Sequence, residues 1–412
     1  MVKNKLQDVG NKGQICYFLG AGFSKASKYQ LPTADGFLSL DMPIYCRDAV
    51  NEKHEIGVRA RLDLSGLLSR LEARYGDLNS LNLESVMSDL YERSSGLGRA
   101  WINRDASFVN ELLTPGKSHW STDQPPPPDG PELSRDYALL LLLICLRLRV
   151  VDATNDECLT TRRLLSTVRL RDSIVTLNYD TIIERHLTEQ VDGRPEPDER
   201  AKELDIYIGP PPSVYDGAAS MFGRFQPRGR GFMAKLHGSV DWRSCSNPDC
   251  PSYRYIERAE RWRRDDLEGA EQLNCVHCGN IPDTVIIPPV STKSFERFPK
   301  LRLMWLQAYH ALRIARRWVF MGVSLAPTDM HLRSLLRAAS EEWLGAEVPG
   351  VDQICIVNKD DSACSKVARR ITECLPPQVQ AVPGGSQPRI ATFASIDDYL
   401  AEAERVDSTR PA

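Results

Sequence analysis

The chain has 412 residues, 42% of them apolar and 26% charged, and its formal net charge is −3 at pH 7. This length allows two or three domains, or one large α/β domain with insertions. The near-neutral charge gives no reason to expect a nucleic-acid partner or an anionic membrane surface. Residues 1–13 lack the apolar core of a signal peptide, and the most apolar run, Tyr137–Leu146, is about half as long as a bilayer requires. Together with eleven scattered cysteines, these features predict a cytoplasmic protein with reduced thiols.

The first predicted element is a buried strand at Ile15–Leu19, followed by the sequence Gly-Ala-Gly-Phe-Ser at 20–24. The two glycines allow a sharp turn and leave room for a ligand close to the backbone. The polar residues after them suit the first turn of a helix, whose positive end attracts phosphate. Lys25 stands where the dinucleotide fingerprint GxGxxG has its third glycine, so only half of that fingerprint is present. Alone, the motif fits equally well a tight turn that binds nothing.

The segment 37–150 is expected to be mainly helical. Leucines recur at helical spacing over Leu62–Leu71, and apolar residues do so again over Leu83–Tyr91. The stretch 114–133 contains four consecutive prolines and predicts a surface loop. A buried helix is expected to begin near Ser134.

Strand signals then return in five short apolar runs, at 173–178, 232–236, 285–287, 318–322 and 353–358. Alternation of strands with helices predicts an α/β protein with a Rossmann-like parallel sheet and helices on both faces. Polar or small residues follow most of these strands, among them Asn178, His237 and Asn358. Such sheets bind ligands beyond the carboxyl ends of their strands, so these residues are expected to gather at one functional edge. Residues 191–202, rich in charge, Pro and Gly, predict a loop.

Taken in order, these motifs resemble the sirtuin family, and more closely its prokaryotic NAD-hydrolysing relatives in antiviral defence. The matching elements are Gly-Ala-Gly-Phe-Ser at 20–24, Thr-Leu-Asn-Tyr-Asp at 176–180, Lys-Leu-His-Gly at 235–238, Ile-Pro-Pro…Lys at 287–293 and Met-Gly-Val-Ser-Leu…Asp at 321–329. The resemblance implies a Rossmann-like core that holds NAD+ as the substrate.

The resemblance also implies roles for individual residues. Asn178 would orient the nicotinamide ribose and an attacking water, Asp180 would lie near the nicotinamide end, and His237 would be the general base. The cofactor-binding residues that it implies are Gly20, Ala21, Gly22, Phe23, Ser24, Gly322, Ser324 and Asn358. Histidine suits this work because its ordinary pKa lies near neutrality. Taken singly, His-Gly also fits a turn, and Asn-Tyr-Asp also fits a helix cap.

Four cysteines form a separate pattern. Cys245 and Cys250 are spaced C-x4-C, and Cys275 and Cys278 are spaced C-x2-C. Two such pairs brought together make a tetrahedral thiolate site, which predicts structural zinc. In the sirtuin family a four-cysteine zinc module follows the His-Gly element, as it does here. His277 is a less favourable substitute ligand, and four reduced thiols on a loop are the simpler alternative.

Two departures from the deacylase pattern bear on the reaction. The segment after the cysteines reads Val-Ile-Ile-Pro-Pro-Val at 285–290 instead of a Phe-Gly-Glu type, and Leu-Pro-Thr at 31–33 replaces Pro-Asp-Phe. Both favour water as the nucleophile and thus an NAD+ glycohydrolase that releases nicotinamide and ADP-ribose. A protein-lysine deacylase and a non-catalytic module that senses NAD+ or ADP-ribose are the alternatives. The presence of both Asn178 and His237 argues against the second of these.

These inferences predict a single NAD-binding domain over 1–404. It would contain the helical insertion at 37–150 and a zinc-ribbon-like module at 242–283, and a disordered tail would follow at 405–412. An enzyme that depletes NAD+ must stay silent until it is triggered, and no second sensing domain is evident. We therefore expect control by a homo-oligomer or by a separate sensor or activator protein.

Overall fold

The computed structural model describes Leu6 and most of the chain from residue 13 to residue 408. The described ranges are 13–39, 55–102, 130–148, 158–169, 172–186, 188–191, 194–197, 233–245, 247–253, 256–258, 275, 277–280, 282–288, 298, 301–326, 329–344, 350–377 and 388–408. The prolines expected to form a surface loop, and the predicted residues 289–293, lie outside these ranges.

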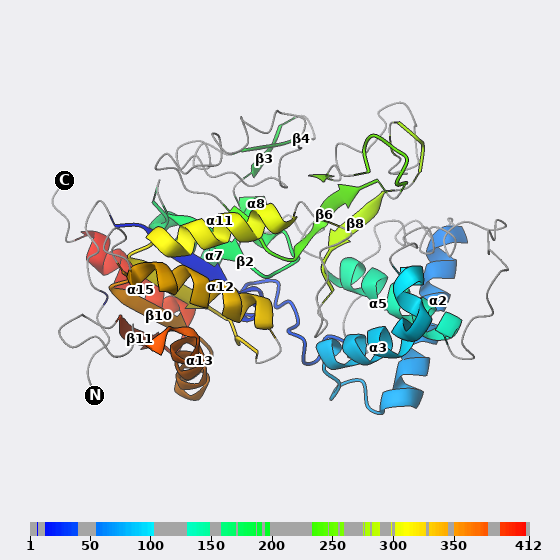
Figure 1. Ribbon diagram of the computed structural model, residues 1–412, viewed down its shortest axis with the longest axis horizontal. Coiled ribbons are helices and arrows are strands. Elements are labelled where there is room, and N and C mark those ends of the chain that lie inside the picture. The colour runs from blue at the N-terminus through cyan, green and yellow to red at the C-terminus, as the bar shows by residue number, and fades with distance from the viewer. Residues whose placement is uncertain are drawn as a thin grey trace.

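Six parallel strands form the central sheet, in the order β11-β10-β9-β1-β2-β5 (Figure 1). The strands are β1 (Ile15–Leu19), β2 (Ser173–Thr176), β5 (Met233–Lys235), β9 (Arg317–Met321), β10 (Gln353–Val357) and β11 (Arg389–Phe393). Numbered along the chain and read from β5, this order is 3-2-1-4-5-6, which is the doubly wound order of dinucleotide-binding folds. The predicted Rossmann-like α/β fold is therefore confirmed. The order reverses between β1 and β9, and ligands bind at that position in such sheets.

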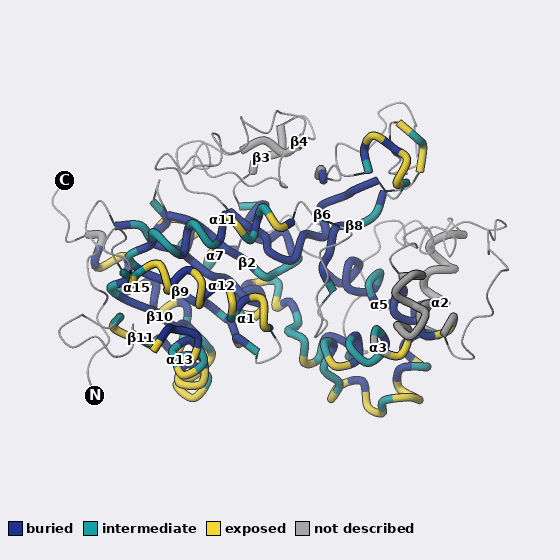
Figure 2. Tube along the Cα trace, viewed as in Figure 1, coloured by how far each residue is buried: buried dark blue, intermediate teal, exposed yellow. Residues whose placement is uncertain are grey.

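Alternate side chains of each central strand pack on opposite faces of the sheet. In β1, Tyr17 and Leu19 belong to one apolar cluster, whereas Cys16 and Phe18 belong to the other. Helices α7 and α15 cover the first face, and α11, α12 and α13 cover the second (Figure 1). These helices are α7 (Leu159–Thr167), α11 (Leu301–Ile314), α12 (Met330–Glu341), α13 (Asp361–Cys374) and α15 (Ile396–Ser408). Figure 2 shows the consequence, since strands such as β9 and β10 are buried along their length while the outer side of α13 is exposed.

A group of long helices lies beside the sheet, at the opposite end of the long axis from both termini (Figure 1). It comprises α2 (Glu55–Tyr75), α3 (Leu83–Ile102) and α5 (Gly130–Leu148), so the described part of 37–150 is largely helical as expected. The group is tied to the loop that follows α1 (Ala21–Ala26). At the start of α3, the Leu83 N–H donates to the Ala34 carbonyl (2.9 Å) and the Asn82 amide to the Asp35 carboxylate (2.7 Å). The boundaries of the insertion stay a prediction.

Two small antiparallel sheets complete the described strands. In one, β6 (Gly238–Ser244) pairs with β7 (Glu257–Arg258) and β8 (Asp283–Ile286). The predicted strand at 285–287 therefore joins this sheet rather than the central one, because the backbone that leaves β5 turns at Gly238 and pairs with it.

The prediction of a loop at 191–202 was wrong for residues 191 and 194–197, which lie in strands. Strand β4 (Arg194–Pro197) pairs with β3 (Thr188–Val191), and Val191 lies opposite Arg194. The sequence Asp-Gly at 192–193 joins them, and this dipeptide favours two-residue hairpin turns. That signal outweighs the charge and proline content on which the loop prediction rested.

The disordered tail predicted from residue 405 also needs correction, because α15 continues to Ser408. The apolar stripe of this helix reaches its last turn, where Val406 is buried like Ala403 and Tyr399. Arg405 pairs with Glu402 one turn earlier (2.7 Å). Burial of this stripe holds the helix together beyond the point where the sequence becomes polar.

None of the described helices has both the length and the apolar character that crossing a bilayer demands.

Candidate active site

The loops that follow β1 and β9 pack directly against each other at the switch point of the sheet. The Gly20 N–H donates to the Met321 carbonyl and the Gly22 N–H to the Gly322 carbonyl, both at 2.9 Å. Gly322 has a φ of +61°, and a Cβ there would lie 2.1 Å from the backbone nitrogen of Phe23. The space expected for a ligand at these glycines is thus filled by the second loop. The glycines are required for close contact between two backbones, and two N–H groups of the turn are already bonded.

A chain of hydrogen bonds joins this turn to the end of β2. The Ser24 hydroxyl donates to Asp180 Oδ2 at 2.6 Å. The Asn178 amide nitrogen donates to Ser24 Oγ at 2.7 Å and to the Gly20 carbonyl at 3.0 Å. The three predicted residues Ser24, Asn178 and Asp180 are therefore brought together at the carboxyl edge of the sheet.

The hydrogen-bonding chemistry of this network fixes which way the Asn178 amide faces. Ser24 has one hydroxyl hydrogen, and that hydrogen is used in the bond to the Asp180 carboxylate. Ser24 Oγ can therefore only accept from Asn178. The Gly20 carbonyl can also only accept. Both amide hydrogens of Asn178 are thus committed, and its Oδ1 faces away from these partners as an acceptor. A half-buried acceptor in a fixed direction is what is needed to orient a hydroxyl group or a water.

Asp180 has structural contacts on both carboxylate oxygens. Its Oδ1 accepts the N–H of Ile182, the first residue of α8 (Ile182–His186), at 3.1 Å. Its Oδ2 accepts the Ser24 hydroxyl. The helix-cap interpretation of this motif is therefore correct for Asp180, and it coexists with the contact to Ser24. The geometry makes Asp180 a residue that orients Ser24 and, through it, Asn178.

His237 lies in the tight turn between β5 and β6, and it is 95% buried. Gly238 follows with a φ of +85°, and a Cβ at this position would lie 2.0 Å from the Val285 carbonyl oxygen. The backbone carbonyl of His237 accepts the Ile287 N–H at 2.8 Å. The His-Gly turn therefore needs its glycine, and β8 holds the histidine in place.

Aromatic rings surround the His237 side chain. The Tyr179 ring centroid lies 6.2 Å from that of His237, and the Trp305 ring centroid lies 5.9 Å away on α11. The Trp305 indole N–H donates to the Leu236 carbonyl at 2.9 Å. Tyr179 lies between Asn178 and Asp180 in the chain, so its contact with His237 joins the histidine to the segment that carries the Asn178 network.

Tyr179 is held by hydrogen bonds as well as by packing. Its hydroxyl donates to the Ile287 carbonyl at 2.6 Å, and its own carbonyl accepts the Val240 N–H at 2.9 Å. Burial raises the pKa of Tyr179 well above its ordinary value, and the carboxylates of Glu84 and Asp329 raise it further. The hydroxyl therefore stays protonated and serves as a donor.

Ser324 and Asn358 lie after the ends of β9 and β10, as expected, but Asn358 contacts the loop after β9 and Ser324 contacts helix α13. Asn358 donates its amide to the Val323 carbonyl at 3.2 Å, and the Ser324 carbonyl accepts from the Arg370 guanidinium at 2.8 Å. The Ser324 side chain is exposed. Their predicted contacts with phosphate and ribose stay predictions.

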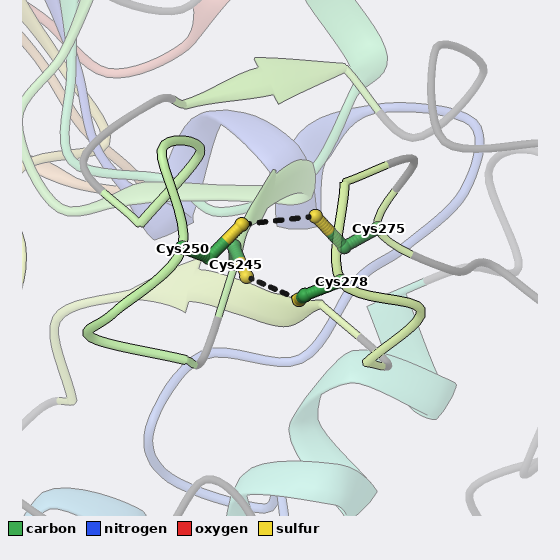
Figure 3. A group of neighbouring side chains, drawn as sticks. All are labelled: Cys245, Cys250, Cys275 and Cys278. Atoms are coloured by element: carbon green, nitrogen blue, oxygen red, sulfur yellow. Dashed lines mark hydrogen bonds between the residues drawn. The ribbon is translucent and has the colours of Figure 1, made fainter.

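The four cysteines converge as the sequence predicted (Figure 3). Cys245 Sγ lies 3.5 Å from Cys278 Sγ, Cys250 Sγ lies 3.5 Å from Cys275 Sγ, and all four sulfur atoms lie within 4.8 Å of one another. A disulfide needs about 2 Å, so these are thiols. A zinc ion with four sulfur ligands at about 2.3 Å has sulfur–sulfur distances of about 3.8 Å. His277 is exposed and is not part of the group.

Backbone N–H groups point at the sulfur atoms. The Ser252 N–H lies 3.4 Å from Cys250 Sγ. Burial raises the pKa of the Cys275 thiol, whereas the N–H groups of Cys278 and His277 and the neighbouring thiols lower it, and the outcome is about 7. Donors of this kind stabilise thiolates and orient metal ligands. The donor set and its spacing thus fit a structural zinc site.

Comparisons with known proteins add little to this geometry. No protein-family profile and no curated protein matches the chain. Among solved structures, one on the mechanism and regulation of Sir2 enzymes is similar, with 11% identity, a TM-score of 0.38, and coverage of 96% of this chain and 94% of that one. A Sir2 mutant with a p53 peptide and NAD has 11% identity, a TM-score of 0.35, and coverage of 97% and 96%. A Sir2 complex with an inhibitor, 2'-O-acetyl-ADP-ribose and a deacetylated peptide has 10% identity, a TM-score of 0.32, and coverage of 96% and 95%. Likeness at this level carries no argument for function, which rests on the site itself.

Three residues of the site received no role from the sequence. Tyr179 lies inside the motif at 176–180 and Lys235 inside the motif at 235–238. The feature that could have identified Lys235 is a charged residue within an apolar predicted strand. Trp305 has no local signal, because only the packing of α11 against β5 brings it to His237.

Proposed function

We propose that this protein is an NAD+ glycohydrolase that acts in the cytoplasm. The observation that carries the proposal is the oriented Asn178 amide at the carboxyl edge of a doubly wound sheet, next in the chain to Tyr179, whose ring packs near that of His237. This edge is where such sheets bind dinucleotides. The identity of the substrate, NAD+, is inferred from the ordered motifs that resemble the sirtuin family.

The reaction breaks the bond between the nicotinamide nitrogen and the ribose C1′. The electron pair of that bond moves to the ring nitrogen, which neutralises the positive charge of the leaving group. Water attacks the opposite face of C1′, and its proton goes to a base, so nicotinamide, ADP-ribose and a proton are formed. In this scheme Asn178 Oδ1 orients the water or a ribose hydroxyl, and His237 accepts the proton. Ser24 and Asp180 hold the Asn178 amide in place.

Water is a better candidate for the nucleophile than an acyl-lysine peptide. In a deacylase, the segment after the zinc module helps to form the peptide channel. In this chain Ile287 is buried, its N–H is bonded to the His237 carbonyl, and its carbonyl is bonded to the Tyr179 hydroxyl. Both backbone groups are thus used within the chain and are not available to pair with a peptide.

The proposal also includes a structural zinc site and a biological role. Cys245, Cys250, Cys275 and Cys278 would hold a structural zinc ion, which would keep the module at 242–283 folded. Four protein ligands leave no open position on that ion for catalysis. We further propose that the enzyme depletes NAD+ in abortive defence against phage, and that a homo-oligomer or a separate sensor protein triggers it.

The test is to incubate the purified protein with NAD+ and to separate nicotinamide, linear ADP-ribose and cyclic ADP-ribose by chromatography. A second arm adds an acetylated lysine peptide, and a third uses the variant Asn178→Ala. Nicotinamide release that needs no peptide and is lost in the variant supports the glycohydrolase. Release only with the peptide, together with loss of the acetyl group, would show a deacylase instead. Binding of NAD+ without cleavage at any protein concentration would exclude activation by a homo-oligomer alone and would leave a sensing module or an enzyme that needs its separate sensor protein.

A further inference from the structure

Lys235 and Glu184 form an ion pair that is almost wholly excluded from water. Lys235 Nζ lies 2.7 Å from Glu184 Oε1, and the two side chains are 1% and 6% exposed. Burial raises the pKa of Glu184, and the charge of Lys235 opposes that rise. Removing two charges from water is costly, and apolar side chains of similar size often stabilise a core equally well. Packing alone therefore does not account for this pair.

The second contact of the lysine connects it to the candidate active site. Lys235 Nζ also donates to the backbone carbonyl of Asp180. The carboxylate of the same residue accepts the Ser24 hydroxyl, which in turn accepts the Asn178 amide. Lys235 is the last residue of β5, and His237 follows two residues later. One buried ammonium group therefore links the strand that leads to His237 with the segment that carries Asn178.

We propose that Lys235 is a positioning residue, with Glu184 as its counter-charge, and that it fixes the Asn178–Asp180 segment relative to His237. Both side chains are buried, so they act through the Asp180 carbonyl and through β5 rather than by contact with a substrate. Glu184 lies on α8, and the N–H of the first residue of α8 donates to the Asp180 carboxylate. Asp180 is therefore bonded both to Lys235 and to the helix that carries the counter-charge Glu184. The expected change in kcat rests on the proposed function, whereas the expected change in the surroundings of His237 does not.

The experiment replaces both charges together, with Glu184→Leu and Lys235→Met in one variant. This removes the ion pair and the donor to Asp180 while keeping apolar volume, so the variant is expected to fold with a melting temperature close to that of the wild type. Release of nicotinamide from NAD+ should fall ~10- to 100-fold in kcat, with a smaller change in KM, because small displacements of reacting groups have effects of that size. Glu184→Gln keeps an acceptor for Nζ and the contact to Asp180, and should retain most of the activity.

The matched control is the ion pair between Arg70 and Asp136, in which Asp136 is fully buried and the nitrogen–oxygen distance is 2.6 Å. It lies in the helical group, so Arg70→Met with Asp136→Leu should leave kcat unchanged.

A second readout is independent of turnover: the imidazole NMR signal of His237, assigned by its loss in His237→Gln. It should shift in the Glu184/Lys235 variant and not in the control. A folded Glu184/Lys235 variant with unchanged kcat and an unchanged His237 signal would overturn the positioning role. If the wild type releases no nicotinamide at any protein concentration, the proposed hydrolase has no activity without a separate activator, and the His237 signal alone tests whether the pair positions His237.

Discussion

The four-cysteine cluster and the Asn178 network are both small groups of polar atoms, but they are assembled over very different distances along the chain. The most distant sulfur contact in the cluster, between Cys245 and Cys278, spans 33 residues. The contact between Ser24 and Asp180 spans 156 residues. The cluster needs two short turns and one antiparallel sheet, whereas the network needs the order of the central sheet. Local spacing therefore predicts the ligands of the first, and only the topology explains the second.

The difference also concerns what each group tolerates. The four cysteines are equivalent ligands, so loss of any one removes the same site. In the network each residue has a distinct part, since Asp180 accepts the hydrogen bond of the Ser24 hydroxyl and so orients it, and Ser24 Oγ accepts the Asn178 amide N–H and so orients Asn178. Replacements in the network should thus have graded effects on turnover, while replacements in the cluster should have uniform effects on metal content and stability.

The largest effect on turnover is expected for His237→Ala. A general base contributes about 10²- to 10⁴-fold, so the rate of nicotinamide release should fall by that factor. The melting temperature should also fall, because loss of the buried imidazole leaves a cavity between Tyr179 and Trp305. His310→Ala is the control, because His310 lies on α11 outside the network and should leave the rate unchanged. Full turnover in a folded His237→Ala protein would remove His237 from the reaction.

A loss of about 100-fold is expected for Asn178→Asp. This change keeps the shape of the side chain but removes both amide hydrogens, and it places a carboxylate against the Gly20 carbonyl and near Asp180. Ser24→Ala, which removes one acceptor for the amide and leaves Gly20, should cost less. Chromatography of the products with NAD+ in excess measures both rates. Equal activity of Asn178→Asp and the wild type would show that the amide orientation derived above plays no part.

The sequence predicted the sheet and the four cysteines well, because both depend on local patterns. Short apolar runs located five of the six central strands, whereas β11, which begins with an arginine, was not predicted. Residues such as Asn178 and His237 were correctly expected at one edge. It did not predict that Gly20 and Gly22 contact Gly322, since nothing in either loop identifies its partner. Nor did it predict that the Ser24 hydroxyl donates to Asp180, whereas the cofactor-binding role that the resemblance implies for Ser24 stays a prediction. Contacts between segments that are distant in the chain are decided by the order of the strands, which composition and spacing do not specify.

Removal of the metal tests the cluster. We expect about one zinc ion per chain by mass spectrometry of the metal. Cys275→Ser should lose this zinc and expose the segment between β6 and β8 to protease, because binding of a structural metal supplies folding free energy. Cys158→Ser is the control: this cysteine is also buried, but it occupies the N-cap position of α7, where serine is favoured. A zinc-free wild type that resists protease would show that the four thiols are structural without metal.

The smallest expected effect separates backbone strain from crowding at the turn that carries His237. Gly238 and Gly76 have similar positive φ angles, +85° and +90°. A Cβ at Gly238 would meet the Val285 carbonyl oxygen at 2.0 Å, whereas a Cβ at Gly76 would meet nothing within 4 Å. Gly76→Ala should therefore lower the free energy of unfolding by about 1 kcal/mol, which is the strain of the left-handed backbone alone. Gly238→Ala should lower it by about 3 kcal/mol or more, because β8 must also move. Denaturant unfolding measures both, and equal losses would mean that β8 is loosely held and does not fix the position of His237.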